Sequence, residues 1–321
     1  MQLHFGGSLP GGIGGAGAGA RRLEDAGFAY ASTGEHFMRG NPPQPTGLAL
    51  PVLGVAAGAT SRIRLLSGIV LAPLYHPVML AKLAATLDVE SAGRLTLGIG
   101  IGGEFPVEFQ ALGVPVKQRA SRTDESLALI KRLWTEEKVS HSGRFYQLDD
   151  VTLSPRPAQR PHPPIWVSGR REGAMRRAAR FGDGWFPYFY SPEHYRNSVA
   201  RISGFAGESG RDLSGFQWGH FASISIADTV EEAAQVAAER LGARYSSRAE
   251  MLSLVGSYSI LGPVPACVDR IAAYIEAGAR RIVFGWSGKP EDIERHIAIT
   301  ANEIIPAVRE RFAAAETSPS S

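Results

Sequence analysis

The segment Leu95-Thr96-Leu97-Gly98-Ile99-Gly100-Ile101 follows a stretch with helical spacing, 77–89, and runs on into two further glycines. A short run this apolar is typical of a parallel strand that helices cover on both faces. The same alternation of apolar run and helical stretch occurs eight times along the chain. The runs are 3–9, 29–33, 63–71, 95–101, 164–168, 184–187, 221–226 and 281–286.

Eight such units predict an α/β fold of the (β/α)8 type, a TIM barrel, whose active site lies on the loops after the strands. We expect insertions after strands 4 and 7. After strand 4, residues 138–163 hold a turn at Gly143 and a cluster of prolines, and after strand 7 the irregular segment 242–261 predicts a lid. A chain of 321 residues fits one such domain, 1–315, followed by a disordered tail, 316–321.

Composition indicates a globular protein of a reducing compartment. Apolar residues make up 44% and charged residues 20% of the chain, and the formal charge is only +3. We find no apolar run that predicts a membrane span and no pattern of an export signal at the N-terminus. The single cysteine, Cys267, cannot form an internal disulfide, which fits the cytoplasm. Because the basic residues are dispersed, we expect no nucleic-acid binding, and we also expect no metal site.

A glycine-rich loop near the N-terminus matches a dinucleotide-binding fingerprint. Gly12-Ile13-Gly14-Gly15-Ala16-Gly17 fits G-x-G-x-x-G between a strand and a helix, and Glu35 follows at nearly the required interval. Two observations weigh against this interpretation: a Pro-Gly pair separates the strand from the motif, and the pattern occurs again at 98–103. We favour a surface loop for 11–19 and keep an NAD-dependent dehydrogenase as a minority hypothesis.

Several short segments between residues 60 and 187 occur in an order that is specific to one family. No single segment is specific by itself. They are 62–65, 76–82, 86–88, 91–95, 98–100, 109–115, 122–125, 133–134, 157–159, 163–167 and 182–185. This series resembles the luciferase-like family of flavin-dependent oxidoreductases, whose members are βα barrels. The resemblance therefore implies the same fold and a reduced flavin-type cofactor.

The resemblance also implies catalytic residues. Glu35 and His36 end the second strand, where relatives face the flavin ring, and the histidine serves some relatives as a proton donor or acceptor. Histidine suits that role because imidazole gains and loses protons near neutral pH. Glu104 follows the fourth strand, near an acid–base carboxylate of some members. We expect these three residues to be catalytic.

Cofactor contacts are expected at three strand ends. Ala72 stands where relatives back the flavin ring, and Gly100 and Gly102 permit close approach of the backbone to a ligand. In the family the turn after the fifth strand holds the cofactor phosphate, and helix N-terminal amides with guanidinium groups favour an anion in any case. The residues of this turn are Ser168, Gly169, Arg170 and Arg171.

Aromatic residues gather at the predicted strand ends, and we interpret them as the walls of a flat, apolar substrate pocket. They are Phe5, Phe37, Tyr75, Trp185, Tyr188, Tyr190 and Trp286.

Two branches of the family share this scaffold. We favour a monooxygenase that uses reduced FMN (FMNH2), received from a flavin reductase, on an apolar organic substrate. The alternative is hydride transfer with the 8-hydroxy-5-deazaflavin coenzyme (coenzyme F420). A non-catalytic flavin-binding protein remains a further alternative. Relatives commonly dimerise, so we also expect a homodimer.

Overall fold

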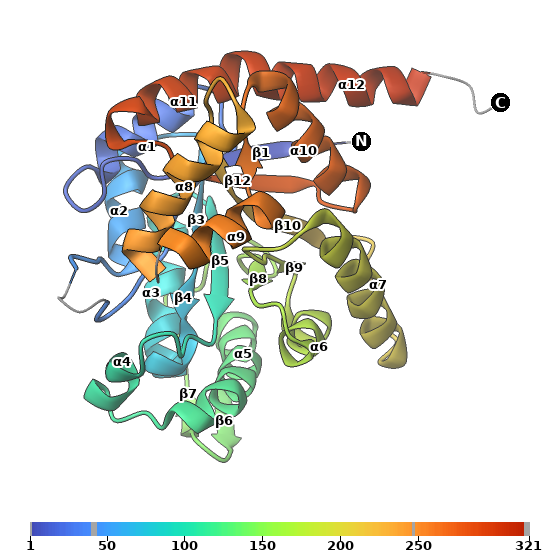
Figure 1. Ribbon diagram of the computed structural model, residues 1–321. Helices are drawn as coiled ribbons and strands as arrows, with labels where there is room; N and C mark the ends of the chain where they lie inside the picture. Colours follow the sequence, from blue (N-terminus) through green and yellow to red (C-terminus); the bar gives the residue numbers. More distant parts are fainter. Residues whose placement is uncertain (1, 40–43, 246–247, 318–321) are drawn as a thin grey trace.

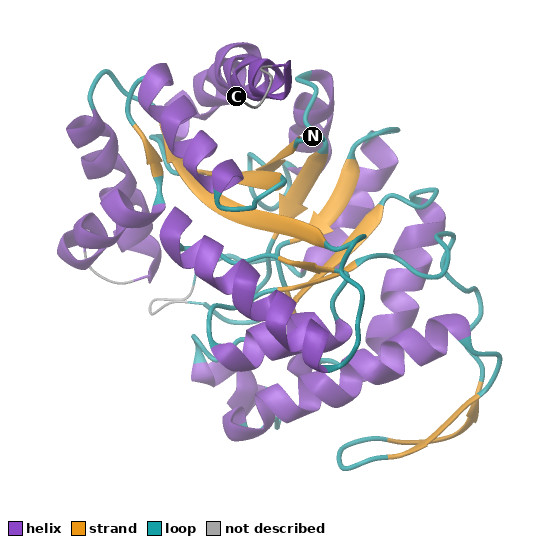
Figure 2. Ribbon diagram, turned by 90° about the vertical axis from the view of Figure 1, so that its right-hand side faces the viewer, coloured by secondary structure: helices purple, strands orange, loops and turns teal. Residues whose placement is uncertain are grey.

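The strands close into a ring in the computed structural model, which describes residues 2–39, 44–245 and 248–317 (Figures 1 and 2). Around the ring the order is β12-β1-β2-β3-β5-β8-β9-β10, all parallel, and the pairing of β10 with both β9 and β12 completes the circle. This confirms the predicted (β/α)8 barrel and excludes the open sheet of a dinucleotide-binding domain. The strands are β1 (His4–Ser8), β2 (Tyr30–Thr33), β3 (Arg64–Ser67), β5 (Leu95–Gly100), β8 (Ile165–Val167), β9 (Gly184–Trp185), β10 (Gln217–Ser225) and β12 (Arg281–Trp286).

The third predicted strand is divided into β3 and β4 (Val70–Leu71), with a cis peptide bond between Gly68 and Ile69. Here the backbone of β3 crosses close to β5. The Ser67 hydroxyl donates to Gly98 O (3.0 Å) and accepts from Gly98 N (2.8 Å). A Cβ atom on Gly98 would lie 1.9 Å from Ser67 O. Only glycine therefore permits this crossing at the fourth strand.

Helices surround the barrel where the alternation predicts them. The long ones are α1 (Ala16–Asp25), α2 (Ala49–Ala59), α3 (Pro77–Glu90), α5 (Arg119–Thr135), α6 (Glu172–Phe181), α7 (Pro192–Glu208) and α10 (Val264–Glu276). The chain ends with η3 (Pro290–Asp292), α11 (Ile293–Ile299), a π-helical turn η4 (Thr300–Ile304) and α12 (Ile305–Thr317). Of the tail predicted to be disordered, 318–321 lie outside the described residues. Among the described residues, no helix is both long and apolar enough to span a membrane.

Both predicted insertions are present, and one differs in kind from the prediction. After β5 come the short helices α4 (Pro106–Ala111) and η2 (Val116–Gln118), then α5, and then a hairpin of β6 (Val139–Ser142) and β7 (Gln147–Val151) that projects from the body (Figure 2). After β10, the described residues of the segment 242–261 are not irregular. The segment contains the end of α8 (Val230–Tyr245), then α9 (Arg248–Tyr258) and β11 (Ile260–Leu261).

Tertiary packing explains the helical lid. Met251 and Val255 of α9 are buried against Ala237 and Leu241 of α8, in a small core separate from the main one. Gly256 and the serines of α9 give it a weak intrinsic preference for helix, which this packing overrides. Phe189, from the loop after β9, also packs against this small core. The α8–α9 pair follows the carboxyl end of β10 and therefore lies at the mouth of the barrel.

Two apolar layers hold the barrel together. The inner layer fills the ring with Tyr30, Leu66, Trp166, Phe186 and Val283. The outer layer lies between strands and helices and includes the stacked rings of Phe5 and Phe284, 6.1 Å apart. Because side chains alternate along each strand, one residue faces the interior and the next faces the helices.

Candidate functional site

Glu35, directly after β2, is a buried junction of three elements. Its carboxylate accepts hydrogen bonds from Ala49 N at the start of α2 (2.9 Å), from Leu71 N in β4 (2.8 Å) and from the Tyr75 hydroxyl (3.1 Å). Burial raises the pKa of Glu35, although these three donors favour the charged form. Burial likewise raises the pKa of Tyr75. Glu35 thus ties together the strand ends that carry the site, and its oxygens are occupied by the protein itself.

His36, the next residue, is paired with a carboxylate that lies far away in the sequence. Its Nδ1 lies 3.0 Å from Glu108 Oε1, and Glu108 Oε2 accepts from Phe37 N at 2.6 Å. The ring of Phe105 meets the imidazole edge to face, with centroids 4.8 Å apart. The His36 side chain is 18% exposed and that of Glu108 is 1% exposed. Nδ1 of His36 is therefore occupied by Glu108, and Nε2 is the ring nitrogen that a ligand can contact.

Sequence reasoning missed Glu108. The predicted carboxylate, Glu104, lies exposed on the loop before α4, whereas Glu108 is buried in the first turn of that helix. A helix of six residues is too short to show an apolar period, so α4 leaves little trace in the sequence. The one local signal is Pro106 at the first helical position, which marks a helix start two residues before Glu108.

Glycines form the wall beside this pair. A Cβ on Gly100 would lie 1.9 Å from Ile69 Cδ1, so the Ile69 side chain packs directly against this glycine. Gly102 has φ +58° and Gly103 has φ +102°, conformations that favour glycine. Ala72 is fully buried, whereas Ile69 is partly exposed, so Ile69 is the side chain that this segment offers to a ligand.

The turn between β8 and α6 has the form of an anion cradle. Gly169 has φ +123°, and a Cβ there would lie 2.6 Å from the Cβ of Ala174 in α6. Ser168 is buried, Arg171 is exposed at the N-cap of α6, and Gly169 O accepts from Trp185 Nε1 at 2.9 Å. The first turn of a helix leaves amide groups without intrahelical acceptors, and these groups attract anions. The cradle therefore suits the phosphate of a cofactor.

Arg170 belongs to this turn, but its side chain is engaged elsewhere. Its guanidinium group lies over the Tyr188 ring, 5.3 Å from the centroid, and donates to Phe189 O at 3.0 Å. The Tyr190 hydroxyl donates to Arg170 O at 3.3 Å. Arg170 thus joins the loop after β8 to the loop after β9, and through Phe189 it reaches the small core of the lid.

The predicted pocket aromatics fall into two groups. Phe37 and Tyr75 meet at 5.6 Å near the His36 pair, and Tyr188 and Tyr190 lie on the loop after β9, all of them partly exposed. Three others are placed differently, because they occupy strand positions that face the helices and are buried in the outer layer. These three, which we correct from pocket to core, are Phe5, Trp185 and Trp286.

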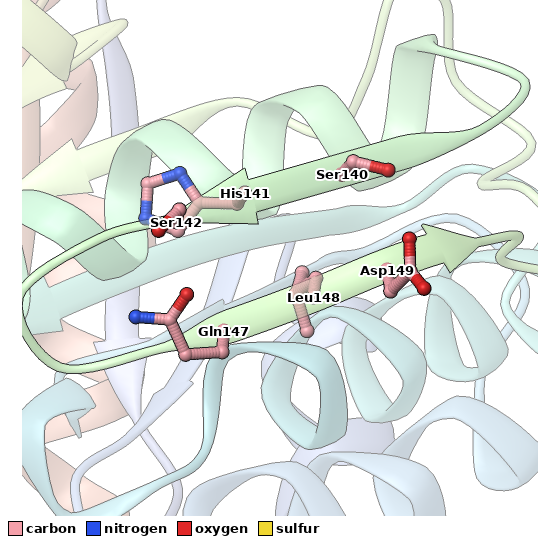
Figure 3. A pocket seen from close by; sticks show the side chains of 6 residues that line it. All are labelled: Ser140, His141, Ser142, Gln147, Leu148 and Asp149. Carbon is pink, nitrogen blue, oxygen red and sulfur yellow. The ribbon is translucent and has the colours of Figure 1, made fainter.

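Two other features contain none of the site residues described above. A shallow pocket is formed by the projecting hairpin alone, with Ser140, His141, Ser142, Gln147, Leu148 and Asp149 along it (Figure 3). In the Gly12 loop, Gly12 and Gly14 have positive φ and Ile13 is exposed. Within the described residues, no group of three or more His, Cys, Asp or Glu side chains is placed to hold a metal ion.

Comparisons with known proteins agree with this geometry. Residues 4–281 match the family model of luciferase-like monooxygenases. The chain is 31% identical over 223 residues to the FMNH(2)-dependent dimethylsulfone monooxygenase of Pseudomonas putida, a match covering 68% of this chain and 60% of that protein. It is 29% identical to the oxygenase component of the flavin-dependent trigonelline monooxygenase of Acinetobacter baylyi (90% and 88% covered). It is 28% identical to an F420-dependent glucose-6-phosphate dehydrogenase of Microbacterium testaceum (90% and 92% covered).

A solved structure shares the fold. An F420-dependent secondary alcohol dehydrogenase, solved with an F420-acetone adduct, superposes with a TM-score of 0.84 at 21% identity and covers 96% of this chain and 100% of that one. The names of these three curated relatives describe flavin- or F420-dependent oxidoreductases, as the sequence series implies. The chain is therefore a member of the luciferase-like monooxygenase family, built on a closed (β/α)8 barrel.

Proposed function

We propose that the protein is a flavin-dependent monooxygenase that uses reduced FMN and dioxygen on an apolar organic substrate. The observation that carries this proposal is the His36–Glu108 pair at the barrel mouth, with its Nδ1···Oε1 distance of 3.0 Å and only the imidazole partly exposed. It shares the rim with a glycine wall and an anion cradle. A proton-transfer group, a surface for a planar ring and a phosphate site are the parts that such an enzyme needs.

The residues present fit the cofactor. Ser168, Gly169 and the first amides of α6 would hold its phosphate, with Arg171 adding positive charge. Ile69 and Gly100 would lie against its ring. Reduced FMN supplies the electrons that activate dioxygen, whereas the deazaflavin coenzyme supplies a hydride and does not use oxygen.

His36 moves the proton. Because Glu108 accepts at Nδ1, the neutral imidazole carries its hydrogen there and leaves the Nε2 lone pair to take a proton from a reacting group. When the imidazole is charged, the adjacent carboxylate stabilises it. Glu108 is itself fixed by Phe37 N, so the imidazole plane is oriented before any ligand arrives.

The aromatic side chains at the barrel mouth indicate the kind of substrate. Phe37, Tyr75, Phe105 and Tyr188 are partly exposed aromatic side chains near the strand ends, so a flat or apolar molecule fits best. The α8–α9 pair closes over this end, with Phe189 as its contact to the rim. We propose that these elements select the substrate.

Deazaflavin-dependent hydride transfer is the second candidate, because a relative that aligns over nearly its whole length carries an F420-dependent activity in its name. Titrating the apoprotein with FMN, reduced FMN and the deazaflavin coenzyme separates the two. We expect reduced FMN to bind in the micromolar range and to support oxygen consumption with an apolar substrate. Binding of the deazaflavin alone would reject the monooxygenase assignment.

The cradle can be tested in the same titration. Gly169→Ala places a methyl group against Ala174 and forces alanine into a φ of +123°, so the Kd for reduced FMN should rise about tenfold. Gly173→Ala is the matched control, since a Cβ there meets nothing within 4 Å and the backbone is helical. Equal affinity in both variants would place the phosphate elsewhere.

Two partners belong to the proposal. A separate flavin reductase would deliver the reduced cofactor, because one relative is named as the oxygenase component of its enzyme. The second partner is another copy of this chain. Helix α2 contains no charged residue, and Val55 (60% exposed) lies on it, next to α3 with Met79 (57%) and Leu83 (37%). An apolar face of this kind on two packed helices favours self-association.

The proposed dimer can be tested with one substitution. Val55→Asp puts a charge in the α2–α3 face, and sedimentation velocity should then show a monomer where the wild type is a dimer. Val230→Asp is the control, since Val230 is also exposed (43%) but lies on α8. A wild-type monomer, or a Val55→Asp dimer, would contradict the assignment.

We also place the protein in the cytoplasm as one domain of residues 1–315. The thiol of the single cysteine, Cys267, is buried, and burial raises its pKa to about 12. A chain with one cysteine forms no internal disulfide, which supports a reducing compartment.

A further inference from the structure

The end of the barrel opposite the mouth collects basic side chains. His4 begins β1, Arg64 begins β3 and Arg281 begins β12, and β12, β1, β2 and β3 are successive neighbours in the ring. His4 is the register partner of Arg281, and Tyr30 is the partner of Arg64. Register partners on parallel strands project from the same face of the sheet.

That face is the barrel interior. Tyr30 packs against Trp166 in the inner layer, with ring centroids 5.4 Å apart, and the His4 ring meets Tyr30 edge to face at 6.4 Å. Arg64, as the partner of Tyr30, therefore points toward the interior at its amino end. Trp166 Nε1 donates to Gln217 Oε1 at 3.0 Å and closes the floor above these residues. We refer to this amino end of the barrel, with His4, Arg64 and Arg281, as the basin.

The basin is positively charged and lacks a counterion within the protein. Burial lowers the pKa of His4, and the charges of Arg281, Arg64 and Arg309 of α12 lower it further. Over residues 2–39, 44–245 and 248–317, none of these three guanidinium groups forms an ion pair with a carboxylate. Arg64 donates to the neutral Gln159 Oε1 at 3.0 Å, and Arg309 lies 5.8 Å from the Phe5 ring centroid.

Buried hydrogen-bonding atoms in this region also lack partners. Arg281 Nε is buried and has no acceptor. Thr96 is fully buried, and its hydroxyl has no partner either; it is the register partner of Leu66, an inner-layer residue. Buried polar atoms in native proteins are nearly always hydrogen-bonded, so such atoms call for an unseen partner. A water molecule can accept a hydrogen bond from one of these donors, but it does not neutralise the charge of the guanidinium groups.

We propose that this basin is a second anion site that binds a divalent oxyanion of the phosphate type. Arg64 and Arg281 supply the charged donors, His4 adds a hydrogen bond, and the charge of Arg309, which also acts on His4, adds to the attraction. Guanidinium groups match the oxygen geometry of phosphate. The site lies at the opposite end of the barrel from the α6 cradle and does not depend on the proposed function. The ligand is either free phosphate or a phosphomonoester, since both present the same oxygens.

The experiment uses the full chain, and the His4 ring reports on this end of the barrel rather than on the mouth. Inorganic phosphate is titrated at constant ionic strength against chloride, and the His4 ring signals are followed by NMR together with the thermal unfolding temperature. We expect saturable shifts of His4, a rise in the unfolding temperature and a Kd about tenfold weaker in Arg281→Gln. Arg64→Gln is the second variant in case the first does not fold. Arg62→Gln, an exposed arginine beside the same strand, is the control and should bind as the wild type does.

Three results would overturn the site: His4 signals that do not respond, shifts without saturation, or Arg64→Gln and Arg281→Gln proteins that bind as tightly as the control. A parallel titration with glycerol 1-phosphate assigns the source. If the ester binds at least as tightly as phosphate, the basin takes a phosphorylated molecule. If the ester is excluded and phosphate binds, it takes the free ion, and the proposal stands in both cases.

Discussion

Replacing His36 by asparagine is expected to lower kcat by about 10²- to 10⁴-fold, the range for loss of a general acid or base. Asparagine keeps a hydrogen bond toward Glu108 but cannot carry a proton between a reacting group and the protein. The affinity for reduced FMN should be unchanged, because the cradle after β8 is intact. Single-turnover oxidation of the substrate, with separate cofactor titration, measures both quantities.

The chain offers a matched control for this variant. His141 on the hairpin also pairs with a carboxylate, with 3.1 Å between Nε2 and Glu125 Oε1, but the pair is far along the chain from any barrel strand end. His141→Asn should leave kcat at the wild-type value. If His36→Asn turns over as fast as His141→Asn, then His36 has no part in proton transfer, and the non-catalytic alternative gains support.

Removing the Glu35 carboxylate should have the largest effect on stability. Glu35→Ala leaves two buried amides and the Tyr75 hydroxyl without an acceptor, and each such donor costs about 1–3 kcal/mol. We therefore expect the free energy of unfolding to fall by more than about 3 kcal/mol in chemical denaturation. Glu24→Ala is the control, because the Glu24 carboxylate also accepts from backbone amides, those of Ser61, Arg62 and Ile63, but at the surface where water replaces it.

The pH dependence of stability distinguishes the charge of Glu35 from its hydrogen bonds. Its folded-state pKa is raised, chiefly by burial, so the folded protein holds this proton more tightly than the unfolded chain does. The resulting stabilisation is full below the unfolded-state pKa and is lost as the pH rises through the folded-state value. Relative to Glu35→Gln, which does not titrate there, the wild type should lose stability over that interval, from about pH 4.5 upward. Parallel curves for the two proteins would show that the carboxyl is not perturbed by burial.

The barrel could be predicted from the sequence because a strand buried on both faces leaves a continuous apolar run, as in 95–101. His36 and Glu35 could be placed at the mouth because they directly follow such a run. Glu108 could not, since α4 is too short for a periodic pattern and the contact to His36 spans 72 positions. The sequence did not predict α9, because this helix forms through packing on α8, which local preference does not reveal.

The misplaced aromatics have a separate cause. In β12, Phe284 and Trp286 face the helices, whereas Val283 belongs to the inner layer. When a run is apolar at every position, the sequence does not show whether its odd- or its even-numbered side chains face the barrel interior. Phe5 and Trp286 could therefore be assigned either to the interior or to the face covered by helices. The register between strands settles this, and register is a property of the closed ring rather than of any one segment.

The crossing of β3 over β5 sets limits for anyone who redesigns this enzyme. A Cβ on Gly98 would lie 1.9 Å from the backbone oxygen of Ser67, so we expect substitutions there to destabilise the barrel, whereas at Gly100 the nearest atom is the end of the Ile69 side chain. Ile69 and Tyr188 have partly exposed side chains, and we expect substitutions at these two positions to alter the substrate range while the scaffold is kept.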